Sequence, residues 1–105
     1  MQTITVSELK QWQDSKKDFQ LLDVREQWEY DLCRLDGATL APLGTLQIKP
    51  PELDKEEPLV VYCHHGSRSK MGCMILTSLG FKNTFTLTGG IDAYATEVDP
   101  SIEKY

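Results

Sequence analysis

The segment 62–69, Tyr-Cys-His-His-Gly-Ser-Arg-Ser, contains the residue types of a nucleophilic site. A cysteine that loses its proton is a strong nucleophile. Arg68 follows Cys63 after four residues, and its guanidinium is a permanent cation whose donors suit the oxyanions of sulfur or phosphorus. Gly66 allows the backbone between them to curl, so that successive N–H groups form an anion-binding concavity. The spacing therefore predicts a cysteine nucleophile with a bound anionic reactant.

The elements on either side of this loop strengthen that prediction. The apolar, β-branched run at 58–63 favours a buried strand, and a helix is expected to begin near Ser67 or Arg68. The first N–H groups of a helix have no intrahelical partner and carry partial positive charge. A thiol beside them ionises more readily, and a negative covalent intermediate is stabilised there.

The cysteines and histidines also allow other interpretations. Cys63 as a small apolar residue closing a strand fits poorly, because the four residues after it are small or polar. Cys73 is expected to be a packing or partly exposed residue inside a helix. Cys33, beside Arg34, is expected to be an ordinary thiol, with a redox or resolving role as the alternative. A zinc site at Cys63-His64-His65 is not expected, because the other cysteines stand singly and the chain has no other histidine.

The remaining pattern alternates strand-like and helix-like segments, which predicts an α/β fold with a small, mostly parallel sheet and helices on both faces. Strands are expected at 19–24, 38–41, 58–63 and 84–87. Helices are expected, in chain order, from an N-cap at Ser7 through Trp12, at 27–32, from the loop after Cys63 to Gly80, and at 91–94. The face expected to be buried on the third of these helices in chain order consists of Met71, Met74, Ile75, Ser78 and Leu79.

Length and charge set further limits. The 105 residues make one domain, 1–105, and the proline-rich stretch 49–58 is a surface connection within it. The net charge of −5 argues against a nucleic-acid or anionic-membrane partner. The first residues lack the basic and apolar regions of a signal peptide, and three cysteines are consistent with reduced thiols, so a cytoplasmic location is expected.

Five segments in order resemble the single-domain form of the rhodanese (thiosulfate:cyanide sulfurtransferase) family. They are LDVRE at 22–26, EY at 29–30 with LDGA at 35–38, YCHHGSRS at 62–69, GFKN at 80–83 and LTGGI at 87–91. The chain departs from the family pattern at Arg34 and Asp36, where the family often has His and Pro. It also has Tyr94 where the family often has Trp.

The resemblance implies a persulfide formed on Cys63 from a small sulfur-containing anion or a protein persulfide, then passed to a thiophilic acceptor. Backbone N–H groups of the loop would stabilise it, Arg68 would hold the donor, and no organic cofactor or metal is expected. The implied substrate-binding residues are His64, His65, Gly66, Ser67, Arg68 and Ser69.

The sequence allows alternatives for the role of Asp23 and Arg25 and for the function of the domain. Asp23 and Arg25 are interpreted as an ion pair or hydrogen bonds that support the loop, with direct substrate binding as the alternative. The alternatives to sulfur transfer are a non-catalytic binding or regulatory module and a cysteine-dependent phosphatase. Related phosphatases of this fold use a Cys-x5-Arg loop, one residue longer than the Cys-x4-Arg loop found here.

Overall fold

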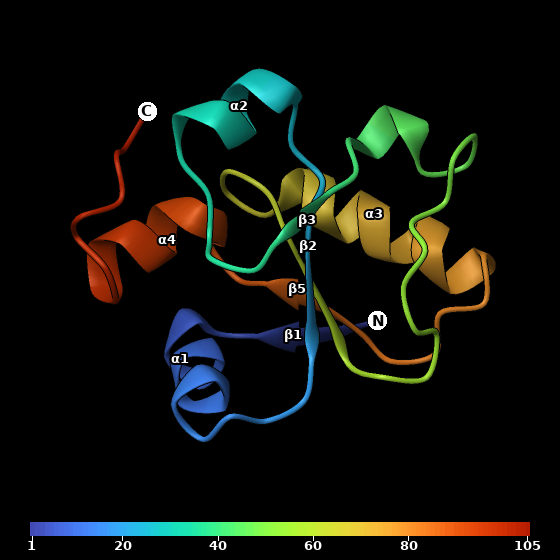
Figure 1. Ribbon diagram of the computed structural model, residues 1–105, viewed down its shortest axis with the longest axis horizontal. Coiled ribbons are helices and arrows are strands. Elements are labelled where there is room, and N and C mark those ends of the chain that lie inside the picture. Colours follow the sequence, from blue (N-terminus) through green and yellow to red (C-terminus); the bar gives the residue numbers. More distant parts are fainter.

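A computed structural model describes residues 1–105, which form a five-stranded sheet and four α-helices (Figure 1). All neighbouring strands are parallel, in the order β1-β5-β4-β2-β3, so the predicted α/β class is confirmed. The strands are β1 (Gln2–Ile4), β2 (Gln20–Asp23), β3 (Thr39–Leu40), β4 (Leu59–Tyr62) and β5 (Thr84–Leu87). The helices are α1 (Val6–Asp14), α2 (Gln27–Leu32), α3 (Ser67–Ser78) and α4 (Gly90–Glu97), with a 3₁₀ helix at Leu43–Thr45.

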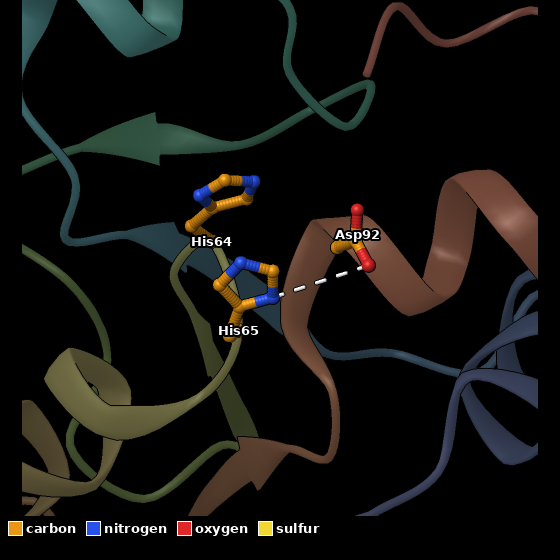
Figure 2. Close-up of side chains that lie close together, drawn as sticks. All are labelled: His64, His65 and Asp92. Carbon is orange, nitrogen blue, oxygen red and sulfur yellow. Dashed lines mark ion pairs between the residues drawn. The ribbon is translucent and has the colours of Figure 1, made fainter. Parts of the chain in front are cut away.

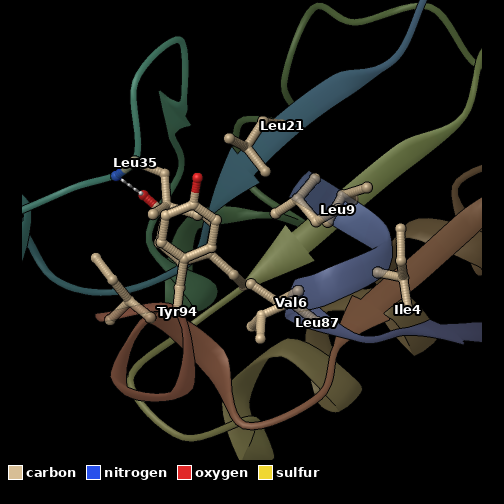
Figure 3. Close-up of a cluster of buried hydrophobic side chains, with 10 residues drawn as sticks. Ile4, Val6, Leu9, Leu21, Leu35, Leu87 and Tyr94 are labelled. Carbon is tan, nitrogen blue, oxygen red and sulfur yellow. Dashed lines mark hydrogen bonds between the residues drawn. The ribbon is translucent and has the colours of Figure 1, made fainter. Parts of the chain in front are cut away.

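Each face of the sheet has its own hydrophobic core. Helices α1 and α4 cover one face, where Leu9 and Tyr94 pack on Leu21 and Leu87 (Figure 3). Helix α3 covers the other face, where Leu76 packs with side chains from β2 and β4. Consecutive residues of a strand point to opposite faces of the sheet. Because both faces are covered by helices, residues on both must be apolar, and the strands therefore have unbroken apolar runs instead of alternating ones.

The buried face of α3 differs from the predicted one. Met71 and Met74 are 52% and 61% exposed, and the helix instead buries Ser69, Gly72, Cys73 and Leu76. A Cβ atom added to Gly72 would lie 3.4 Å from Val24 and 3.5 Å from Val61, in ordinary van der Waals contact, so the helix lies against the sheet at this residue. The prediction followed the period of the large apolar residues and missed a face on which Leu76 is the one large side chain.

Two smaller expectations near the N-terminus are also corrected. The N-cap of α1 is Thr5 rather than Ser7, because Thr5 and Glu8 form a reciprocal capping box with N–O distances of 3.1 and 2.9 Å. The segment before it forms the edge strand β1, which was not predicted. None of the helices combines the length and the apolar character needed to cross a membrane.

Candidate active site

Cys63 lies directly after β4, at the carboxyl end of the sheet, with its side chain buried. Its Sγ atom accepts hydrogen bonds from the backbone N–H of Gly66 at 3.0 Å and of Ser69 at 3.3 Å. Ser69 is in the first turn of α3, where N–H groups lack intrahelical partners. The loop therefore directs two main-chain donors at the sulfur, an arrangement suited to a negatively charged sulfur atom.

Local contacts fix the curl of the loop. Gly66 has φ +126°, in the region that favours glycine, which allows its N–H to turn back toward Cys63. The hydroxyl of Ser69 donates to the carbonyl of Gly66 at 2.9 Å and pairs with the hydroxyl of Thr86 on β5. These bonds also explain why Ser69 faces the sheet.

The start of α4 holds the other side of the loop. The N–H of Ile91 donates to the carbonyl of Cys63 at 2.9 Å, and the N–H of Asp92 donates to the carbonyl of His64 at 3.1 Å. Gly90 has φ +61°, and a Cβ atom there would lie 2.5 Å from the Cys63 carbonyl oxygen and equally close to that of His64. A glycine at position 90 is therefore needed for α4 to approach the backbone at Cys63 and His64.

Arg68 is engaged with a partner that was not predicted. Its two terminal nitrogens donate to the carboxylate of Glu29 on α2, at 2.6 and 2.9 Å. The side chain of Glu29 is 4% exposed and that of Arg68 is 33% exposed. The hydrogen bonds from Arg68 outweigh the effect of burial and lower the pKa of Glu29 to about 2. Glu29 is thus a buried anion that fixes the orientation of the loop arginine.

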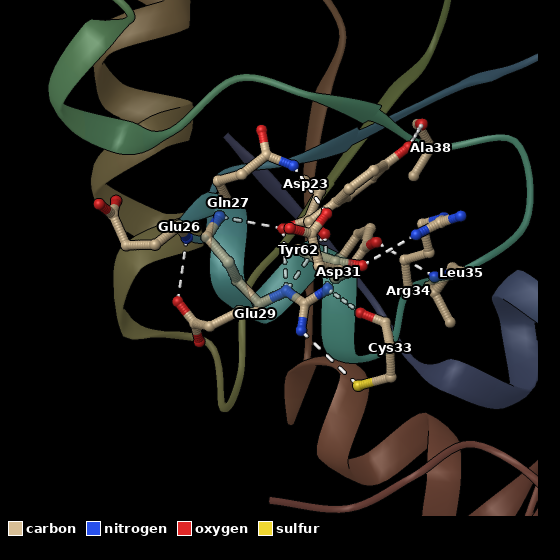
Figure 4. A network of polar contacts seen from close by, with 12 residues as sticks. Asp23, Glu26, Gln27, Glu29, Asp31, Cys33, Arg34, Leu35, Ala38 and Tyr62 are labelled. Atoms are coloured by element: carbon tan, nitrogen blue, oxygen red, sulfur yellow. Dashed lines mark hydrogen bonds and ion pairs between the residues drawn. The ribbon is translucent and has the colours of Figure 1, made fainter.

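Asp23 and Arg25 form a second, fully buried ion pair next to the site (Figure 4). The guanidinium donates to both carboxylate oxygens and to the carbonyl of Cys33 at 2.6 Å. Neither residue bonds to the loop 63–69. Arg25 reaches it through Tyr105, whose hydroxyl accepts from Arg25 at 2.8 Å and donates to Glu29 at 2.7 Å. The structure thus shows the predicted strand-end ion pair, with an indirect connection to Arg68.

The two histidines lie on the outer side of the loop. The ring of His64 is stacked on that of Tyr105 and on that of His65, with centroid distances of 3.9 Å in both cases. Burial and the neighbouring His65 lower the pKa of His64. His65 and Ser67 are exposed and border a groove of about 700 Å³ that also contacts Lys70. All the predicted loop residues are therefore in one place, although only Gly66 and Ser69 bond to the sulfur.

The remaining cysteines lack such surroundings. Cys73 is buried in α3, and burial raises the pKa of its thiol to about 11. Cys33 is partly buried, with its sulfur 3.9 Å from a guanidinium nitrogen of Arg25. Trp28 is 62% exposed, and its ring meets that of Tyr105 edge-on.

Three residues important to the site were missed. Glu29 has a partial signal in the sequence, since it stands three residues after Glu26 and accepts from its N–H at 3.0 Å, as in a capping box. Gly90 belongs to a Gly-Gly pair that predicted only a turn. Tyr105 carries no local signal, because its role depends on contacts with residues 76 and 80 positions away.

Comparison with known proteins identifies the domain type. The sequence model of the rhodanese-like domain family matches residues 5–97 of this chain. The chain is 34% identical to the thiosulfate sulfurtransferase GlpE of Coxiella burnetii, over 85% of this chain and 84% of that protein. It is also 34% identical to the probable adenylyltransferase/sulfurtransferase MoeZ of Mycobacterium tuberculosis, over 98% of this chain but only 27% of that longer protein.

A solved structure gives the same result. The rhodanese-like domain protein from Staphylococcus aureus superposes with a TM-score of 0.85 and 28% identity, covering 100% of this chain and 99% of the other. The similarity therefore extends over the whole fold.

Proposed function

Because this chain belongs to the rhodanese-like domain family, we propose that it is a sulfurtransferase that carries sulfane sulfur as a persulfide on Cys63. The observation that carries this proposal is the pair of hydrogen bonds from the Gly66 and Ser69 amides to the Cys63 sulfur. These donors stabilise the negative charge of the Cys63 thiolate, which is the nucleophile in the proposed transfer.

The proposed reaction has two balanced steps. The Cys63 thiolate attacks the outer sulfur of thiosulfate, the new S–S bond forms, and the old S–S bond breaks with its electron pair leaving on sulfite. The resulting Cys63 persulfide is then attacked at its outer sulfur by an acceptor such as cyanide, which becomes thiocyanate and restores the thiolate. A low-molecular-weight or protein persulfide replaces thiosulfate as donor by the same exchange.

The other loop residues are proposed to bind the reactants. His65 and Ser67 line the groove beside the loop, and the ring of His64 is stacked on that of His65. Arg68 supplies positive charge near the incoming dianion while Glu29 keeps it in place. The three free cysteines support a reducing compartment such as the cytoplasm.

A thiosulfate:cyanide assay tests the proposal. The wild type should produce thiocyanate, Cys63→Ser should not, and Cys73→Ser should retain activity as the matched control. Incubation with thiosulfate alone should add one sulfur atom to the intact mass of the wild type and of Cys73→Ser, but not of Cys63→Ser. If the wild type produces no thiocyanate and gains no sulfur, the proposal is refuted.

One observation favours a second candidate, a non-catalytic binding module. Arg68 is paired with Glu29 instead of standing free to receive an anion. An inactive wild type that binds a protein partner equally well with Cys63→Ser would establish that function. Phosphate-ester hydrolysis that depends on Cys63 would instead indicate a phosphatase, which the four-residue spacing between Cys63 and Arg68 disfavours.

A further inference from the structure

We propose that His64, His65 and Asp92 bind a divalent transition-metal ion of the zinc type beside the loop. One ring nitrogen from each histidine and one carboxylate oxygen of Asp92 lie within 4.8 Å of one another (Figure 2). Three atoms so spaced leave a central ion at most about 2.8 Å from each, so zinc bonds of about 2.0–2.2 Å require each ligand atom to move by about 0.7 Å or less.

The two histidine rings must also turn relative to each other, because they are stacked with 27° between their planes and an imidazole nitrogen binds a metal ion in the plane of its ring. His64 is held between Tyr105 and His65, so the turn falls to the exposed ring of His65. The side chain of His65 is 67% exposed, and its Nδ1 atom is 3.9 Å from the Oδ2 atom of Asp92. The Nε2 atom of His64 is the one buried side-chain nitrogen or oxygen in the structure that has no hydrogen-bond partner. A buried polar atom without a partner is often explained by an ion or a water molecule.

The backbone already holds the two halves of the cluster together. The N–H of Asp92 donates to the carbonyl of His64 at 3.1 Å, so α4 and the loop are joined at the residues that supply the ligands. Two imidazoles and one carboxylate suit zinc and other first-row transition metals rather than magnesium or calcium, which prefer oxygen ligands. Three protein ligands leave a fourth position for water or an exogenous ligand.

This site was not predicted from the sequence. A second stretch of cysteines or histidines was expected for zinc, and the chain has none. The structure instead brings the carboxylate of Asp92, 27 positions after His65, to the same place. One nearby cation opposes metal binding, since Lys104 lies 3.5 Å from the Oδ1 atom of Asp92.

Zinc chloride titrated into the full chain tests the proposal by calorimetry and by NMR of the ¹⁵N-labelled histidine rings. Both histidines of the chain are in the cluster, so the ring spectrum contains no other signals. We expect one zinc ion per chain and a change in both ring signals. Asp92→Asn should weaken binding by at least about tenfold, and Lys104→Gln should tighten it.

Two further variants separate this site from other zinc binding. Glu97→Gln removes an exposed carboxylate on the same helix and should leave the affinity unchanged. Cys63→Ser should also retain binding, because the proposed ligand set does not include the thiolate. The proposal would be overturned by any of three results: histidine ring signals that do not change when zinc is added, an affinity of Asp92→Asn for zinc equal to that of the wild type, or loss of zinc binding in Cys63→Ser.

Discussion

The guanidinium of Arg68 and the carboxylate of Glu29 form a bidentate ion pair that joins the first turn of α3 to α2. Tyr105 and the backbone N–H of Glu26 donate to the same carboxylate, so the anion accepts from three side-chain donors and one main-chain donor. Surface ion pairs contribute little to stability, but this carboxylate is almost fully buried and its partner cannot be removed without leaving a charge inside the protein. The pair therefore connects the conformation of the active loop to the stability of the domain.

Replacement of Glu29 by Gln should make the free energy of unfolding less dependent on pH. In the folded protein the hydrogen bonds from Arg68 lower the pKa of Glu29 from 4.5 to about 2. The unfolded carboxyl takes up its proton first as the pH falls, so the stabilisation is complete above its ordinary pKa and is lost toward pH 2. Between about pH 7 and about pH 3, the advantage of the wild type over Glu29→Gln should fall by about 2 kcal/mol.

Urea unfolding at both pH values measures this difference. Glu97→Gln, which removes an exposed carboxylate outside any ion pair, is the matched control. A constant difference between wild type and Glu29→Gln across this pH range would mean that the carboxylate does not have the partners described here.

The placement of Cys63 could be predicted from sequence because it depends on local features. The run at 59–62, the turn at Gly66 and the helix after it are adjacent in the chain, so their patterns suffice to place Cys63 at a strand end before a helix. The helix Gln27–Leu32 and the strand Thr84–Leu87 were predicted with the observed bounds for the same reason.

The features that the sequence did not predict depend on contacts between distant segments. Glu29 meets Arg68 across 39 positions, and Tyr105 meets Arg25 across 80. Ser69 of α3 faces the sheet through its hydrogen bonds to Gly66 and Thr86, and this residue carries no apolar signal. Such pairings depend on the folded arrangement rather than on local propensity, so residue type and spacing do not reveal them.

Gly90→Ala should destabilise the protein and reduce sulfur transfer together. The added methyl group would overlap the carbonyl oxygens of Cys63 and His64, and the positive φ is unfavourable for alanine. We expect a loss of about 2–4 kcal/mol in the free energy of unfolding. Gly44→Ala is the matched control, because a Cβ atom at that position meets nothing within 4 Å. Equal urea midpoints for the two variants would contradict this account.

Cys73 should resist alkylation in the native protein. Burial raises the pKa of its thiol to about 11, and the thiolate is the reactive form. Treatment with iodoacetamide at about pH 8 should leave Cys73 unmodified until urea unfolds the chain. Peptide mass mapping distinguishes the three cysteines. Rapid native modification of Cys73 would show that the α3 face is more accessible than the structure indicates.

Tyr105 should protect His64 through its ring and stabilise the domain through its hydroxyl. The two rings are stacked with an angle of 8° between their planes, while the hydroxyl bonds to Arg25 and Glu29. Tyr105→Phe keeps the ring and should lose about 1–2 kcal/mol of stability. Tyr105→Ala removes both and should also accelerate the modification of His64 by diethylpyrocarbonate several-fold.

The exposed His65 serves as an internal reference for that reaction, because it is the only other histidine in the chain. Peptide mapping of the modified protein gives the two rates separately, and urea unfolding gives the stability of each variant. If His64 reacts at the same rate in the wild type, Tyr105→Phe and Tyr105→Ala, the Tyr105 ring does not cover it in solution. If Tyr105→Phe is as stable as the wild type, the hydroxyl does not bridge Arg25 and Glu29.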